Sequence, residues 1–321
     1  MKKSLIIIIV LVVAAGVVFF MIVEPKRDTT ETTETNVTAN TATEASPIQL
    51  EGRPEANTNT SVTRTTNSNA NHEDTTQEET DTPSTGSSQS IIFLHHSTGG
   101  NIWDGGVSDW FDEYNNANDT SYAITDQEFP KDSPYGWENY PYDYWNIWVN
   151  HAGISEYQDE PTLEILTQQY DTIVWKHCFP VSDIEADSGS PSVSSSDKTI
   201  ANYKLQYTAL KNKMLEFPNT NFIVWTGAAQ VQGATTSDYA RRAQTFFSWV
   251  VDTWDEPGDN IYIWDFYALE TEGGLYLKDS HAESSDDSHP NSSFSSTAAP
   301  LFAQRVVNVI EGRGDSTSIT E

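Results

Sequence analysis

Four short apolar runs constrain the fold of this chain most strongly. They carry no charge, are rich in β-branched and aromatic residues, and span 91–94, 172–175, 222–225 and 261–264. Uninterrupted runs of this length are typical of strands buried on both faces of a parallel sheet. Apolar residues with helical spacing occupy 200–215, 239–254 and about 295–309. Strands that alternate with helices imply right-handed crossovers, so we expect one α/β domain with a doubly wound parallel sheet.

The first 27 residues contain a candidate membrane segment. An uncharged apolar run of 19 residues extends from Leu5 to Val23, and at about 1.5 Å per residue a helix of this length matches the hydrocarbon thickness of a bilayer. Apolar residues continue beyond the small residues at 14–16, which favours an uncleaved anchor over a cleaved signal peptide. The free amino terminus favours an orientation that places the rest of the chain outside the cytoplasm. A cleaved segment would make the protein secreted.

A polar segment follows the anchor. From residue 28 to 88 the chain is dominated by Thr, Asn, Glu and Ser and has almost no large apolar side chain. Such a composition cannot bury enough surface to offset the entropy of ordering, so it predicts a disordered linker. The α/β domain is expected at 89–312, with a disordered tail at 313–321.

The charge and the cysteine content exclude several classes of function. Acidic residues outnumber basic ones by 47 to 17, and the formal net charge is −30. A chain of this charge repels phosphate backbones, so nucleic acid is not an expected partner, and solubility is the simplest explanation of the acidity. The only cysteine is Cys178, so neither an intramolecular disulfide nor a thiolate metal cluster can form. We expect no cofactor and no metal.

Polar side chains follow the predicted strands, at the edge where doubly wound folds place their functional crevice. Ser97 follows the first run, and two glycines after Thr98 let the backbone approach a substrate and present N–H groups to an oxyanion. Asp286 and His289 share one turn before the last helix, so a short loop can present the carboxylate behind the imidazole. A serine nucleophile needs a base, and the base needs an acceptor to hold its tautomer. Ser97, His289 and Asp286 supply these three roles.

These residues give the domain a resemblance to the SGNH, or GDSL-type, hydrolases. The resemblance rests on the serine in the segment Phe93–Gly99 and on the Asp-x-x-His-Pro motif at Asp286–Pro290, and it covers approximately residues 90–312. It implies a flavodoxin-like α/β core and ester hydrolysis through an acyl-enzyme on Ser97. The family's Gly-Asp-Ser triplet is replaced here by His-His-Ser, which keeps only the nucleophile.

The resemblance also indicates an incomplete oxyanion hole. Gly153 resembles the glycine of the family's second block, whose N–H faces the oxyanion, and the N–H of Thr98 is the other expected donor. The family's third block, Gly-x-Asn-Asp, should follow the strand at 172–175, where this chain has Lys176–Asp183 without an asparagine. Losing one oxyanion donor costs about a hundredfold or more in rate. The hole is therefore completed differently, or catalysis is weak.

Three further histidines have simpler explanations than catalysis. His95 and His96 are adjacent on an extended segment and should point to opposite sides, so packing or support of the site is favoured over joint metal binding. His177 and Cys178 are expected to complete the core, because no evident partner fixes them as base and nucleophile.

An aromatic stretch at 135–148 leaves two interpretations open. Seven of its fourteen residues are aromatic, and its Pro, Gly and polar interruptions argue against a regular element. It forms either a stacking wall for sugar rings beside the crevice or part of the core. The first interpretation makes Trp137, Tyr142 and Trp145, together with His96, the candidate substrate-binding residues.

The sequence therefore predicts an extracytoplasmic, membrane-anchored serine esterase. Its expected substrate is an acylated carbohydrate or another small ester. An O-acyltransferase with the same triad is an alternative, as is a catalytically silent surface domain that binds glycans through the aromatic stretch. A metal-dependent hydrolase that uses His95, His96 and the pair Asp286 and Asp287 ranks third.

Overall fold

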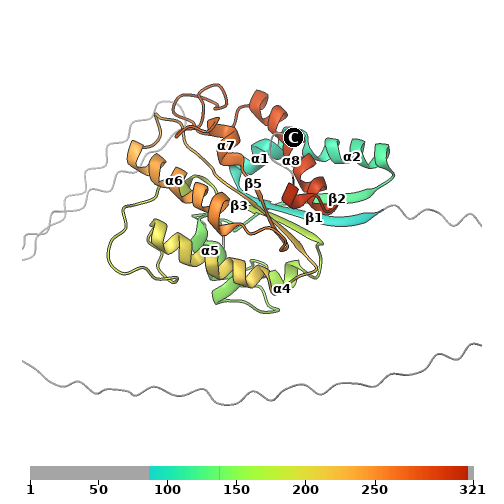
Figure 1. The fold of residues 1–321 in the computed structure, drawn as a ribbon, viewed down its shortest axis with the longest axis horizontal. Helices are drawn as coiled ribbons and strands as arrows, with labels where there is room; N and C mark the ends of the chain where they lie inside the picture. The colour runs from blue at the N-terminus through green and yellow to red at the C-terminus, as the bar shows by residue number, and fades with distance from the viewer. Residues whose placement is uncertain (1–86, 137, 317–321) are drawn as a thin grey trace, which may run out of the picture. The chain divides into compact units, whose positions relative to one another are not determined.

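Five parallel strands form the centre of the computed structural model, which describes residues 87–136 and 138–316 (Figure 1). The strands are β1 (Ser88–His95), β2 (Ser121–Glu128), β3 (Thr172–Lys176), β4 (Asn221–Trp225) and β5 (Ile261–Trp264). Their spatial order is β2-β1-β3-β4-β5, and each neighbouring pair is parallel. This is the order of flavodoxin-like doubly wound sheets, in which the direction of winding reverses between β1 and β3. The predicted α/β class with a parallel sheet is confirmed.

The edge strand β2 was not predicted. The four apolar runs correspond to β1, β3, β4 and β5, whereas β2 has the sequence SYAITDQE and exposes five of its eight residues. Strand β2 pairs with β1 along its whole length, from Ser88 opposite Ser121 to His95 opposite Glu128. Because most of its side chains are exposed to solvent, the sequence of this strand can be polar and contains no continuous apolar run.

Three helices cover one face of the sheet (Figure 1). These are α1 (Ser97–Asp104), α2 (Val107–Asn118) and α8 (Ser292–Ile310). Alternate strand residues meet them, as Phe93 does by packing between Trp225, at 5.1 Å between ring centroids, and Phe302 at 4.8 Å. Asn291 caps α8, because its Oδ1 accepts the N–H of Phe294 at 2.9 Å. The last predicted helix is therefore present and begins three residues earlier than expected.

The other face carries further helical segments, both long and short. They are α3 (Pro141–Trp145), its π-helical continuation η1 (Asn146–Asn150), α4 (Leu163–Leu166), α5 (Ile200–Met214), α6 (Ser237–Trp249) and the π turn η3 (Val250–Trp254). Thr199 and Thr236 cap α5 and α6 with their hydroxyl oxygens. Both predicted central helices are thus found. Shorter elements are η2 (Phe179–Ser182), α7 (Phe266–Thr271) and η4 (Gly314–Ser316).

The predicted anchor at 1–27 and nearly all of the predicted linker at 28–88 lie outside the described residues. Within residues 87–136 and 138–316, no helix has the length and apolarity that crossing a bilayer requires. At the other end, the first residues of the predicted tail pack against α8, where the Arg305 guanidinium donates to the Gly314 carbonyl at 2.6 Å.

Candidate active site

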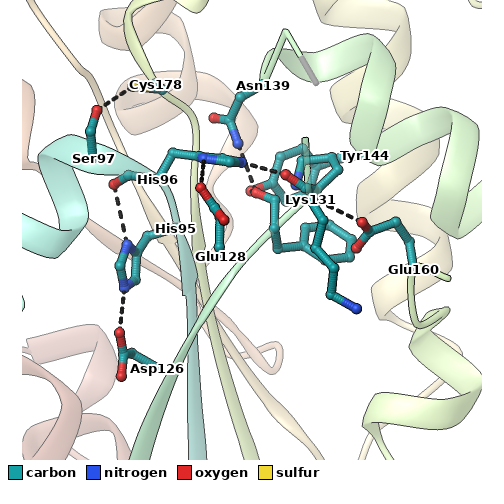
Figure 2. Close-up of polar contacts among 12 residues, drawn as sticks. His95, His96, Ser97, Asp126, Glu128, Lys131, Asn139, Tyr144, Glu160 and Cys178 are labelled. Atoms are coloured by element: carbon teal, nitrogen blue, oxygen red, sulfur yellow. Dashed lines mark hydrogen bonds and ion pairs between the residues drawn. The ribbon is translucent and has the colours of Figure 1, made fainter. Parts of the chain in front are cut away.

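Ser97 lies where β1 passes into α1. It is the first residue of α1, after His96 in an extended conformation, and it is exposed while Thr98 and Gly99 behind it are buried. Its Oγ lies 3.4 Å from Sγ of Cys178, which follows β3 (Figure 2). The hydroxyl is therefore at the carboxyl ends of β1 and β3, where doubly wound folds bind ligands. The positive end of the α1 dipole also favours negative charge there.

His289 is held by Asp287 and not by the predicted Asp286. Nδ1 of His289 lies 2.6 Å from Oδ1 of Asp287, and the His289 backbone N–H donates to the same oxygen at 3.0 Å. Asp286 accepts the hydroxyl of Ser284 at 2.7 Å instead. These two bonds from His289 lower the pKa of the Asp287 carboxyl. An ionised Asp287 makes Nδ1 the donor, which leaves Nε2 of His289 as the basic nitrogen.

One short segment contacts both candidate catalytic residues. Cys178 touches Ser97, and the ring of the next residue, Phe179, meets the ring of His289 edge-on at 5.0 Å between centroids. No hydrogen bond joins Ser97 to His289 within the part of the chain that the structure describes. In free enzymes such bonds are often long and tighten only when substrate binds. The two residues thus reach the same sheet edge from opposite ends of the domain sequence.

The two predicted oxyanion donors occupy different places. Thr98 lies in the first turn of α1, where the N–H groups of Gly99 and Gly100 donate to the His96 carbonyl at 2.7 and 3.3 Å. The leading N–H groups with no acceptor within the helix are therefore those of Ser97 and Thr98. Gly153 lies in the loop between η1 and α4, where its carbonyl accepts the Thr162 hydroxyl at 2.5 Å. Among the described residues no hydrogen bond links it to Ser97. The prediction for Gly153 rested on its resemblance to the glycine of the family's second block, and this contact of its carbonyl gives the prediction no support.

Asn139 is a buried residue of this region that the sequence did not single out. It is fully buried with a φ of +56°, and its Nδ2 donates to the Phe129 carbonyl at 2.7 Å. The backbone carbonyl of Asn139 accepts the N–H of Cys178 at 3.2 Å. The amide is therefore engaged in joining the ends of β2 and β3 and does not replace the family's oxyanion asparagine. An asparagine two residues before Pro141, at the start of α3, is the signal that could have located this turn.

The adjacent histidines each bind a carboxylate of β2, as Figure 2 shows. Nε2 of His95 lies 3.1 Å from Oδ2 of Asp126, and Nδ1 of His96 lies 3.1 Å from Oε1 of Glu128. Their other ring nitrogens face backbone carbonyls, and burial lowers the pKa of both imidazoles. His96 is only 2% exposed, so the prediction that it contacts substrate finds no support in its position. No set of three or more His, Cys, Asp or Glu side chains suited to a metal ion occurs among residues 87–136 and 138–316.

The aromatic stretch is helical from Pro141 onward, and that part belongs largely to the core. Pro141 begins α3, because a proline at the first helical position loses no hydrogen bond. Trp145 is 7% exposed and packs on Tyr142 at 5.6 Å between ring centroids. The expectation of an irregular segment is therefore wrong for residues 141–148, and Trp145 is part of the core rather than a stacking surface. Trp137 lies outside the described residues.

His177 and Cys178 are both buried. His177 has no exposed surface, meets Tyr144 edge-on at 4.7 Å, and has its pKa lowered well below the usual value by burial. Cys178 is 1% exposed. Both side chains pack as the sequence predicted, although Cys178 also touches Ser97.

A cavity of about 370 Å³ opens away from these residues, between α7 and the start of α8. Its lining consists of Leu269, Glu272, Ser280, His281, Ser293, Phe294 and Thr297. Neither Ser97 nor His289 contributes to it. The candidate catalytic residues therefore lie on an open edge of the sheet rather than in this hollow.

The Glu160 carboxyl is hydrogen-bonded to the segment that follows β2. Its Oε1 accepts the N–H of Lys131 at 2.5 Å, and its side chain is fully buried (Figure 2). Its second oxygen has no hydrogen-bond partner among the described residues. Burial raises the pKa of this carboxyl from 4.5 to about 7.

The raised pKa predicts that the protein loses stability as the pH rises from about 4.5 to about 7. In this range the folded state keeps a proton that the unfolded chain has released, so the free energy of unfolding falls by on the order of 3 kcal/mol. Glu160→Gln stays neutral, still accepts from Lys131, and should remove this fall. Urea unfolding at pH 5 and pH 8 measures it, with Glu113→Gln on the exposed surface of α2 as the control. Equal pH dependence in the two variants would contradict the assignment.

Comparison with known proteins places no family on this chain. No known protein family matches the sequence, and no curated protein matches it. Among solved structures, BT4096, a gut microbial diltiazem-metabolizing enzyme, is similar with a TM-score of 0.42 and 9% sequence identity. The match covers 68% of this chain and 47% of that one, so this chain spans about half of its length. Because a fold alone does not define an activity, the function is argued from the site.

Proposed function

We propose that this protein is a serine ester hydrolase in which Ser97 is the nucleophile and His289 is the general base. The observation that carries the proposal is the 2.6 Å contact between His289 Nδ1 and Asp287 Oδ1, in the turn directly before α8. An imidazole oriented in this way by a carboxylate is the form that serine hydrolases require of their base. Ser97 at the first position of α1 supports the proposal, because its hydroxyl is exposed at a helix N-terminus.

The proposed reaction proceeds through an acyl-enzyme. As Ser97 Oγ attacks the ester carbonyl, Nε2 of His289 takes its proton, and the Asp287 carboxylate stabilises the imidazolium. The oxyanion of the tetrahedral intermediate faces the leading N–H groups of α1, among them that of Thr98. Collapse of this intermediate breaks the ester bond, and His289 returns the proton to the leaving alcohol. Water, activated by the same base, then releases the acid and restores Ser97.

We further propose that the substrate is an acylated carbohydrate outside the cytoplasm. The support for this part is the apolar run at 5–23 followed by a long polar segment, the pattern of an anchored extracytoplasmic domain. The aromatic stretch gives it no support, because Trp145 packs in the core. That burial equally weakens the glycan-binding alternative. An O-acyltransferase would use the same three residues, and adding a sugar acceptor separates it from a hydrolase by the partition of product.

Labelling with a fluorophosphonate tests the nucleophile. The probe should modify the protein stoichiometrically, and peptide mapping should locate the label on Ser97. Ser97→Ala should lose both the label and turnover of p-nitrophenyl acetate, with unchanged circular dichroism. Ser108 is an exposed serine on the neighbouring helix α2, and Ser108→Ala should behave as the unaltered protein. Full esterase activity in Ser97→Ala would overturn the proposal.

A further inference from the structure

The ammonium group of Lys176 is buried against the turn that carries Ser97. Lys176 is the last residue of β3 and has no exposed surface. Its Nζ donates to the hydroxyl of Thr98, and to the His177 carbonyl at 2.5 Å. Its stem passes close under α1, since a Cβ added at Gly99 would lie 2.9 Å from Lys176 Cδ. A lysine from the centre of the sheet is thus bonded to the residue next to the proposed nucleophile.

This burial is costly, and its charge is only partly compensated. Lysine is almost never fully buried unless it is paired or functional. The opposing charge comes from Glu270 on α7, which is also buried and accepts the N–H of Ala229 at 2.6 Å. Burial lowers the pKa of Lys176 and raises that of Glu270, and the attraction between them opposes both shifts. Lys176 also lies 5.8 Å from the centroid of the Trp225 ring. Neither Glu270 nor Trp225 explains why Lys176 is also hydrogen-bonded to Thr98.

The hydrogen bond between Lys176 and Thr98 bears on how the proposed reaction stabilises its oxyanion. Negative charge would develop on the substrate oxygen near the first turn of α1, whereas the N–H of Gly153 faces the Glu164 carboxyl and the side-chain amide of Asn139 donates to the Phe129 carbonyl. The remaining protein groups are the N–H groups of that turn, whose effect depends on how firmly the turn is held. A positive charge behind them acts strongly, because the surrounding medium has a low dielectric constant.

We infer that Lys176 is a positioning residue for the oxyanion hole, which it serves through its hydrogen bond to Thr98. The bond holds the first turn of α1 in place, and the buried positive charge behind this turn favours the oxyanion without touching the substrate. The inference rests on the proposed function and explains how a chain that lacks the oxyanion asparagine stabilises the intermediate.

Substitutions at both ends of the bond test the inference. Lys176→Met keeps the length of the stem without the charge, Thr98→Val removes the acceptor, and Thr98→Ser retains it. Active sites are counted with a fluorophosphonate, so that misfolded protein does not enter the rate. Per active site, Lys176→Met and Thr98→Val should lower kcat for an activated ester on the order of tenfold to a hundredfold, with KM within about twofold. Thr98→Ser should restore the rate.

A transition-state analogue separates positioning from a merely structural role. A trifluoromethyl ketone forms a tetrahedral anion on the serine, so its affinity should fall in both variants by the same factor as kcat/KM. Wild-type kcat and analogue affinity per active site would overturn the inference, and Thr98→Val decides alone if Lys176→Met does not fold. Ser97→Ala is measured in parallel. If it stays active, the proposed function fails and the inference with it, whereas an inactive Ser97→Ala beside a fully active Thr98→Val refutes the inference alone.

Discussion

Replacing Asp287 with asparagine should lower kcat for ester hydrolysis on the order of 10³- to 10⁴-fold, whereas Asp286→Asn should leave it within about twofold. Asp287 accepts from both the ring and the backbone of His289. An amide at this position can present an N–H to Nδ1 and so stabilise the wrong tautomer, which takes the lone pair from the nitrogen that must accept the serine proton. Asp286 contacts Ser284 instead. Steady-state hydrolysis of a p-nitrophenyl ester measures both variants.

The adjacent aspartates make this comparison a matched one. They share one turn and one side-chain chemistry, and they differ in the partner that each carboxylate binds. KM should change little in Asp287→Asn, because the carboxylate acts on the base and not on the bound ester. Equal losses in the two variants, or a larger loss in Asp286→Asn, would show that the turn rearranges and that the contact with Asp287 is not the functional one.

The strands could be predicted wherever burial on both faces demanded apolar residues. The runs that became β1, β3, β4 and β5 are continuous for this reason, and they were sufficient to predict the parallel sheet. Strand β2 was missed because most of its residues are exposed, so it contains no such run. The oxyanion role of Gly153 was implied by the family resemblance alone, and among the described residues no hydrogen bond joins this glycine to Ser97.

The polar details of the site depend on contacts that have no local signature. The choice between Asp286 and Asp287 is made by Ser284, whose hydroxyl oxygen accepts the N–H of Asp287 at 3.1 Å while its O–H binds Asp286. Lys176 and Glu270 lie far apart in the sequence, and only the crossover connections of the sheet bring the two side chains close enough to attract each other. Periodicity and motif order predict which segments meet at a sheet edge. They do not predict which side chains become partners there.

The prediction that the aromatic stretch forms no regular element failed for a different reason. Its Pro141 was taken to interrupt a regular element, although a proline at the first position of a helix has the φ that the helix requires. Asp143 then accepts the N–H of Tyr140 at 3.2 Å and closes the start of α3. Local sequence around Pro141 was consistent with either outcome, and the packing of Trp145 decided it.

Gly99→Ala should destabilise the fold and slow the proposed reaction, whereas Gly100→Ala should do neither. A Cβ at residue 99 would lie 2.4 Å from Cβ of His95 and 2.9 Å from Cδ of Lys176, both of which belong to the packed sheet. Helix α1 must therefore move away from β1 and β3, at a cost on the order of 2 to 3 kcal/mol. The displacement also shifts Ser97, and a misplacement of about 1 Å at a reacting group can cost on the order of a hundredfold in rate.

The neighbouring glycine isolates this steric effect from helix propensity. A Cβ at residue 100 would meet Cε1 of His95 at 3.6 Å, an ordinary contact, and alanine favours a helix over glycine by about 1 kcal/mol. Gly100→Ala should therefore be neutral or stabilising in thermal unfolding, with wild-type fluorophosphonate labelling, while Gly99→Ala loses several degrees in Tm and labels at least about tenfold more slowly. If Gly99→Ala had the same Tm and the same labelling rate as Gly100→Ala, there would be enough space between α1 and Lys176 for the added methyl group. The close packing that ties Lys176 to the Ser97 turn would then be absent.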